Sequence, residues 1–178
     1  MKKGFIFVYI FFTLILFQCS SVQVIPEPNL DQVTVKSEPV CTVFTWYWPF
    51  CTQGRAKSFL IKGIYNNSTG EKKYFLDYHL DMLDTDLPVG ISVYLDGVYY
   101  NLKKVSTDYS DILKIESEIN LDLISKMNSA KNNFSFSYSN RKETHNFTLS
   151  SGDTKDFLKQ LNDVVKRINA QEKLKIVN

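Results

Sequence analysis

Apolar and polar residues alternate along the middle of the chain with the period of a β-strand. In the clearest run, Tyr74, Leu76, Tyr78, Leu80 and Met82 alternate with mostly polar neighbours. Because successive side chains of a strand point to opposite faces, this run places its large apolar residues on one face. The pattern predicts a strand that is buried on one side, and it indicates that this part of the chain belongs to a β-sheet.

Similar segments lie before and after this run. The pair Asp96-Gly97 separates two of them and is typical of the two-residue type I′ turn of a β-hairpin. Other turn residues, including Gly70, Pro88 and Asn140, separate further segments. The predicted strands are 58–65, 74–82, 91–95, 98–102, 112–119, 134–138 and 144–149.

Two segments change to the period of an α-helix. A short helix is predicted within 120–131, where Leu123, Ile124 and Met127 share one face. A longer amphipathic helix is predicted from a cap at Asp153 or Thr154. Its apolar residues recur three and four apart, at Phe157, Leu158, Leu161, Val164, Val165 and Ile168.

We therefore predict an α+β domain: a mostly antiparallel β-sheet or partly closed sandwich of about seven strands, with a short inserted helix and a C-terminal amphipathic helix. The length of 178 residues suits one domain, which we place at 40–170. Residues 19–39 contain Pro26, Pro28 and Pro39 and are interpreted as an extended tether, and residues 171–178 as a frayed tail.

The N-terminus has the layout of an export signal. Lys2 and Lys3 precede the apolar stretch 4–17, which is too short to suit a transmembrane helix. Cys19 follows this stretch, and the segment resembles the signal peptide and lipobox of bacterial lipoproteins, in a relaxed form similar to those of spirochaetes. The resemblance covers residues 1–21. It implies a signal peptide over 1–18, cleavage by signal peptidase II and acylation of Cys19.

Alternatives to this interpretation are an uncut membrane anchor or a secreted protein that is cut farther along. Four Asn-x-Ser/Thr sequons, at Asn66, Asn67, Asn133 and Asn146, are the main support for secretion. If Cys19 carries lipid, Cys41 and Cys51 remain as a pair that an exported compartment allows to oxidise, and we expect a disulfide between them.

Charge excludes one class of partner. Cleavage before Cys19 removes two lysines and leaves 19 basic against 19 acidic residues. A neutral mature chain lacks the excess of positive charge that is typical of a nucleic-acid binder, so we expect no nucleic-acid partner. Attachment to the membrane would come from the acyl chains on Cys19.

Both tryptophans lie between the two paired cysteines. Strand alternation over 41–51 would give this segment an aromatic face that fills the core, which is one interpretation. The other is an exposed aromatic loop that contacts a partner, and its candidate binding residues are Trp46, Tyr47 and Trp48.

Residues with catalytic or metal-binding chemistry are sparse. The strand at 74–82 would place Asp77, His79 and Asp81 on one face, and these are possible metal ligands. A half-buried strand shows such a polar face without any metal, and alternate residues diverge too far to suit tetrahedral ligation. No nucleophile elbow, phosphate loop or dinucleotide fingerprint occurs in the sequence.

From these features we expect a protein of the bacterial cell envelope, exported to the outer membrane and held there by lipid. We expect it to be a non-enzymatic binding module for a protein or glycan partner, without a cofactor. The alternatives are a structural factor for envelope assembly or stability, and a metal-dependent hydrolase that uses Asp77, His79 and Asp81.

Overall fold

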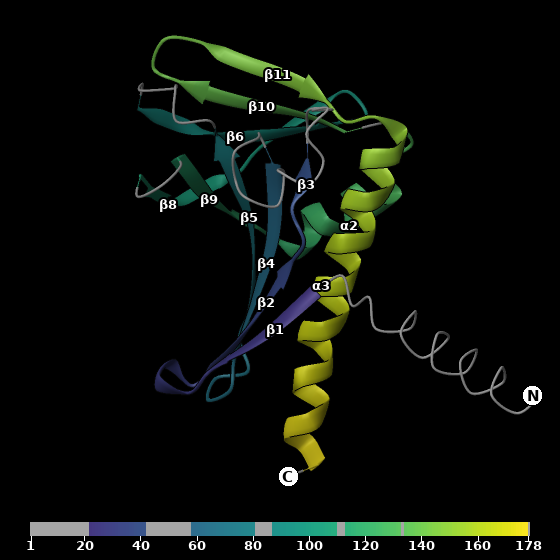
Figure 1. Cartoon of the computed structure of the whole chain (residues 1–178). Helices are drawn as coiled ribbons and strands as arrows, with labels where there is room; N and C mark the ends of the chain where they lie inside the picture. Colours follow the sequence, from purple (N-terminus) through teal and green to yellow (C-terminus); the bar gives the residue numbers. More distant parts are fainter. Residues whose placement is uncertain (1–21, 42–57, 81–86, 110–112, 133, 178) are drawn as a thin grey trace, which may run out of the picture.

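The computed structural model describes residues 22–41, 58–80, 87–109, 113–132 and 134–177, and it combines two β-sheets with two α-helices (Figure 1). The elements in chain order are β1 (Val22–Glu27), the 3-10 helix η1 (Pro28–Leu30), β2 (Gln32–Ser37), β3 (Val40–Cys41), β4 (Ser58–Asn66), β5 (Lys72–Leu80), β6 (Pro88–Leu95), β7 (Val98–Asn101), β8 (Lys103–Asp108), β9 (Leu113–Ile119), α2 (Leu121–Ser129), β10 (Ser135–Asn140), β11 (Thr144–Thr148) and α3 (Ser151–Val177).

The strands pair antiparallel in a large and a small sheet. The large sheet runs β1-β2-β4-β5-β9-β8, with β3 also paired to β4, and the small sheet runs β11-β10-β6-β7. The predicted α+β class is confirmed, with mostly antiparallel sheet, a short inserted helix and a C-terminal helix. The described residues form eleven strands where the sequence predicted about seven.

The first two strands correct the predicted tether. Within the segment 19–39, residues 22–37 form the β1–β2 hairpin at one side of the large sheet, and Val35 is fully buried. Pro26 suggested an extended linker, but it lies in an edge strand, where a missing backbone N–H is tolerated. Asp31 takes a left-handed conformation, with φ 49°, and returns the chain into β2.

The core is densest where the two sheets meet α3. Phe59 of β4 and Phe136 of β10 face each other across the sheets, with ring centroids 4.3 Å apart. Phe157 of α3 meets both rings at steep angles, with centroids 6.2 Å from Phe59 and 5.5 Å from Phe136. All three rings are fully buried, so these aromatic side chains join the three layers.

Helix α3 lies along the large sheet, and a glycine lets it approach (Figure 1). A Cβ atom on Gly63 of β4 would stand 2.6 Å from Cγ1 of Ile168 and 2.9 Å from Cγ1 of Val164. Both distances are shorter than any ordinary carbon–carbon contact. The absence of a side chain at residue 63 therefore sets how closely this helix packs on β4.

The ends of α3 differ from the prediction. The helix begins at Ser151, because Ser150 caps it: Ser150 Oγ accepts from the backbone N–H of Asp153 at 3.1 Å. It ends at Val177, so the backbone of 171–177, expected as a frayed tail, is helical. The predicted apolar face is confirmed, with Phe157, Leu161, Val164 and Ile168 fully buried.

The chain passes directly from the small sheet into the large one between β7 and β8. Leu102 occupies the junction, where its backbone N–H donates to the carbonyl of Ile91 at 2.9 Å and its side chain is buried. Residues 98–108 are thus one extended segment that belongs to both sheets, which closes this side of the sandwich. Strand β8 was missed by the sequence analysis because nearly all its side chains are exposed and no apolar alternation marks it.

Candidate functional site

The outer face of the large sheet carries two of the three predicted metal ligands. Asp77 and His79 lie on the same face of β5, as predicted, and Asp81 lies outside the described residues. Their partners on β9 are Glu116 opposite Asp77 and Lys114 opposite His79.

Asp77 is held in a low-dielectric environment. Its pKa is raised to about 6, mainly by burial; Lys62 opposes the rise, and the neighbouring Glu116 contributes to it. Lys62 forms an ion pair with Glu116, and its Nζ lies 4.9 Å from the ring centroid of Phe75. Within the described part of the chain, Oδ1 of Asp77 is buried and has no hydrogen-bond partner.

His79 is also shifted by its surroundings. Its pKa is lowered to about 4, mainly by burial and in part by the nearby Lys114, so the imidazole is neutral at neutral pH. A neutral imidazole can bind a metal, but a site needs several converging ligands. Among the described side chains no three His, Cys, Asp or Glu residues gather closely enough to hold an ion.

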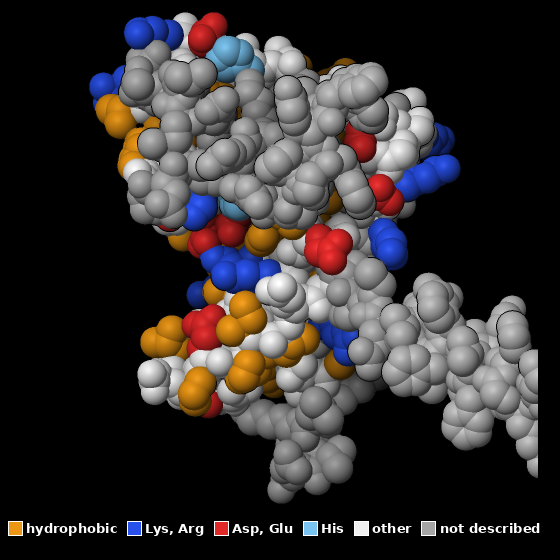
Figure 2. All heavy atoms as spheres, in the orientation of Figure 1, with side chains coloured by type: hydrophobic (Ala, Val, Ile, Leu, Met, Phe, Trp, Pro, Cys, Tyr) orange, Lys and Arg blue, Asp and Glu red, His pale blue; other side chains and the backbone are white. Residues whose placement is uncertain are grey.

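The visible surface over β1 and β2 is more apolar than the rest of that view. In Figure 2 hydrophobic side chains gather on the lower part of the molecule, where Figure 1 places this hairpin. Val24 and Leu30 are the exposed large hydrophobic residues of the hairpin. In Figure 2 charged side chains of both signs lie above this apolar area. No described helix is long and apolar enough to cross a membrane.

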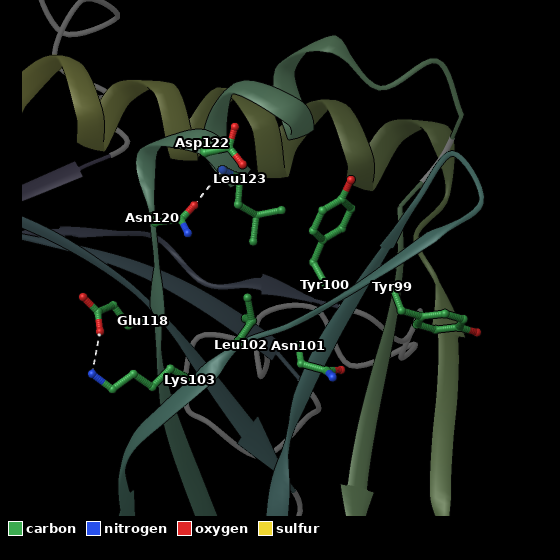
Figure 3. A pocket seen from close by; sticks show the side chains of 9 residues that line it. All are labelled: Tyr99, Tyr100, Asn101, Leu102, Lys103, Glu118, Asn120, Asp122 and Leu123. Carbon is green, nitrogen blue, oxygen red and sulfur yellow. Dashed lines mark hydrogen bonds and ion pairs between the residues drawn. The ribbon is translucent and has the colours of Figure 1, made fainter.

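A cleft lies beside the junction where the chain changes sheets (Figure 3). Its volume is about 490 Å³, and its walls come from β7, β8, the end of β9 and the first turn of α2. Binding sites for small molecules commonly enclose about 300–1,000 Å³. Because β9 leads into α2 through the single residue Asn120, this wall is fixed by two regular elements.

The inner end of the cleft is aromatic and aliphatic. Leu102 and Leu123 line it but are 8% and 6% exposed, so they form a floor with little accessible surface. The half-buried ring of Tyr100 stands beside Leu123, and Nζ of Lys126 lies 5.0 Å from its centroid. The ring of Tyr99 points away from the other lining residues and packs on Tyr94, with centroids 4.6 Å apart.

Two asparagines line the polar part of the cleft. Asn120 is the N-cap of α2, and its Oδ1 accepts from the backbone N–H of Leu123 at 2.8 Å. Asn101 Oδ1 accepts from Ser92 Oγ at 2.6 Å across the β6–β7 pair. Each oxygen is thus held in place, while neither Nδ2 group has a partner among the residues that the structure describes.

Charges at the cleft are balanced by ion pairs. Lys103 Nζ lies 3.4 Å from Glu118 Oε2, and Lys126 Nζ lies 2.5 Å from Asp122 Oδ2 (Figure 3 draws the first pair). These pairs are exposed and contribute little to stability. Their effect is electrostatic: two positive and two negative groups leave the cleft without net charge.

The sequence does not predict this cleft. It does predict the Asp96-Gly97 hairpin and the helix after residue 120, and the structure confirms both: Asp96 and Gly97 have φ of 45° and 95°, as a type I′ turn requires. Only the three-dimensional path of residues 98–103 brings Tyr100 and Asn101 beside Asn120. The one hint in the sequence is Asn120 directly before a helical period, which is typical of an N-cap.

Several predicted site residues lie outside the described part of the chain. These are the lipidation residue Cys19, the aromatic residues Trp46, Tyr47 and Trp48, and Cys51. Cys41 is described by its backbone alone, which pairs with Ser58 in the large sheet. The lipid anchor, the disulfide and the aromatic binding loop stay predictions.

Comparison with known proteins gives no further guide. The chain matches no protein-family model, no curated protein and no solved structure.

Proposed function

We propose that this protein is a lipid-anchored protein of the bacterial outer membrane, and that it binds a partner without catalysing a reaction. The sequence around Cys19 supports the anchor. The observation that carries the binding function is the cleft between β7, β8 and α2, whose two asparagines hold their oxygens in internal bonds and leave amide donors unused.

The cleft holds unused hydrogen-bond donors on a rigid frame. Amide groups that are fixed through their oxygens lose little conformational freedom when their nitrogens bind a ligand. The charged groups at the cleft are paired with each other, and no nucleophile is placed beside a base among the lining residues. This arrangement suits recognition better than covalent chemistry.

The anchor is tested by the intact mass of the native protein after extraction in detergent, measured with and without reducing agent. We expect a chain that begins at an acylated Cys19 and gains two hydrogen atoms on reduction of Cys41–Cys51. A chain without lipid that begins elsewhere, or one that carries glycans, would refute the anchor.

Binding through the cleft is tested on isolated outer membranes. The labelled full-length protein and its Asn101→Asp/Asn120→Asp variant are compared for saturable retention. Aspartate keeps the accepting oxygen at both positions, including the cap of α2, but removes the amide donors. The control is Asn169→Asp/Asn162→Asp, which adds the same charge at exposed sites on α3. We expect weaker retention of the cleft variant alone; equal retention of all three proteins would overturn the cleft as the binding site.

A further inference from the structure

We infer that the cleft binds a neutral, hydroxyl-rich saccharide unit. This inference rests on the proposed binding function and names the class of ligand. Three properties of the lining support it: the accessible surface, the unused polar groups and the net charge.

The cleft presents polar and apolar surface in nearly equal amounts. Leu102 and Leu123 are almost covered by their own neighbours, so no apolar hole is open to a large aliphatic side chain. The ring of Tyr100 is the aromatic surface that remains, at the inner end of the cleft (Figure 3). An aromatic ring next to fixed polar groups suits a ligand that has both C–H surface and hydroxyls, as a pyranose ring does.

Polar groups of both kinds line the cleft. Asn120 presents an amide donor, and the carboxylates of Glu118 and Asp122, each in an ion pair, present acceptors. Asn101 lies on the other face of β7 from Tyr100, beside Ser92. A hydroxyl group both donates and accepts, so neighbouring hydroxyls on a sugar can use the two kinds together. A site built to bond hydroxyls discriminates strongly against analogues that lack them, because its polar groups then stay unpaired.

Charge distinguishes between saccharides. The pairs Lys103–Glu118 and Lys126–Asp122 cancel, so an anionic sugar would have to break a pair to gain a cation. A neutral sugar keeps both pairs intact. The balance therefore favours neutral hexoses or N-acetylhexosamines over uronic or sialic acids.

An extended peptide fits the same region less well. Strand β8, which forms one wall, has a register shift between Lys104 and Ser106 and carries lysines at its exposed edge. Bulges and edge lysines are the usual devices that block addition of a further strand. The structure thus favours recognition by side chains inside the cleft over pairing along the edge.

The test is saturation-transfer-difference NMR on the full-length protein in a detergent that has no sugar head group. The probes are glucose, galactose, mannose, N-acetylglucosamine, maltose, cellobiose and chitobiose, with glucuronic acid and sialyllactose as anionic comparisons. We expect transfer to the ring protons of at least one neutral probe. Asn120→Asp is expected to weaken that binding about tenfold, the loss typical of one or two good hydrogen bonds.

Two control variants make the result specific to the cleft. Asn169→Asp places the same charge on α3 and keeps an oxygen that accepts from Lys72 Nζ, and it should bind like the wild type. Asp156→Asn changes an exposed carboxylate on α3, outside the cleft lining, and should also bind normally.

Each negative outcome has its own meaning. If no neutral probe binds, or if an anionic probe binds more tightly, the saccharide inference is wrong. If the Asn101→Asp/Asn120→Asp variant nevertheless loses retention on outer membranes, the cleft remains the binding site and its ligand is a peptide or protein. If neither assay responds to the cleft variants, the inference and the proposed binding function both fail.

Discussion

Replacement of Asp77 by asparagine is expected to stabilise the protein at neutral pH and to have a much smaller effect in acid. Asp77 is mostly buried on the outer face of the large sheet, and its Oδ1 has no hydrogen-bond partner among the described residues. An ionised carboxylate in that position has lost water without regaining equivalent bonds. Asparagine has nearly the same shape and never carries the charge.

The size of the effect follows from the pKa. Burial raises the pKa of Asp77 from 3.8 in the unfolded chain to about 6 in the folded one. A raised folded-state pKa means that the native state binds the proton more tightly. The contribution of this group to stability is therefore fully present below pH 3.8 and is lost as pH rises through 6. Near pH 7.5 the ionised group costs about 3 kcal/mol relative to acid conditions, since one pKa unit corresponds to about 1.4 kcal/mol.

Urea unfolding from pH 4 to pH 8 measures this difference. The difference in the free energy of unfolding between Asp77→Asn and the wild type should be about 2–3 kcal/mol larger at pH 7.5 than at pH 4. Asp156→Asn, which changes an exposed carboxylate on α3, controls for the loss of one charge. A difference between Asp77→Asn and wild type that stays constant across this pH range would refute the argument that burial controls this carboxylate.

Three further substitutions test how the fold is held together. Gly63→Ala should lower the free energy of unfolding by about 2 kcal/mol, because its Cβ meets Ile168 and Val164, and Ile168→Ala should recover part of that loss in a double-mutant cycle. Ser150→Ala should cost about 1 kcal/mol by removing the cap of α3, whereas Ser150→Asn keeps an accepting oxygen and should cost less in the same denaturation assay. Asp96→Ala should increase hydrogen exchange at the amides of Lys131 and Asn132, which donate to its carboxylate. These hydrogen bonds lower the pKa of Asp96. In the wild type, the protection of the two amides should therefore weaken when the pH falls far enough to protonate Asp96. Unchanged exchange at both amides would show that this carboxylate does not fix the loop.

The parts of the fold that the sequence predicted are those with one strongly buried face. Strands β5 and β9 alternate because their inner side chains are buried in the core, and α3 shows its period because one stripe of it is buried. Strands β1 and β8 lie at the two sides of the large sheet, where burial is weaker. There Pro26 and the exposed lysines masked the strand pattern, since local composition carries little information about pairing with a distant partner.

The candidate site was less predictable for a related reason. Asp77 and His79 share a face because they are two residues apart on one strand, a relation that the sequence contains. The cleft instead joins Tyr100 and Asn101, which leave the small sheet, to Asn120 between β9 and α2. That proximity depends on the crossing at Leu102 and on the register of β8 with β9, and neither is encoded in the spacing of residue types.

If Cys19 carries lipid, as proposed, the position of β1 limits how far the domain can stand from the membrane. Ordered pairing begins at Val22, which is bonded into the hairpin opposite Ser37 and is 7% exposed. Three residue steps separate Val22 from Cys19, and a fully stretched chain gains at most about 3.6 Å per residue. An acyl group on Cys19 would thus hold the start of the large sheet within about 11 Å of its own attachment point. A protein attached in this way works at the lipid surface itself, and any partner must come to that surface to reach it.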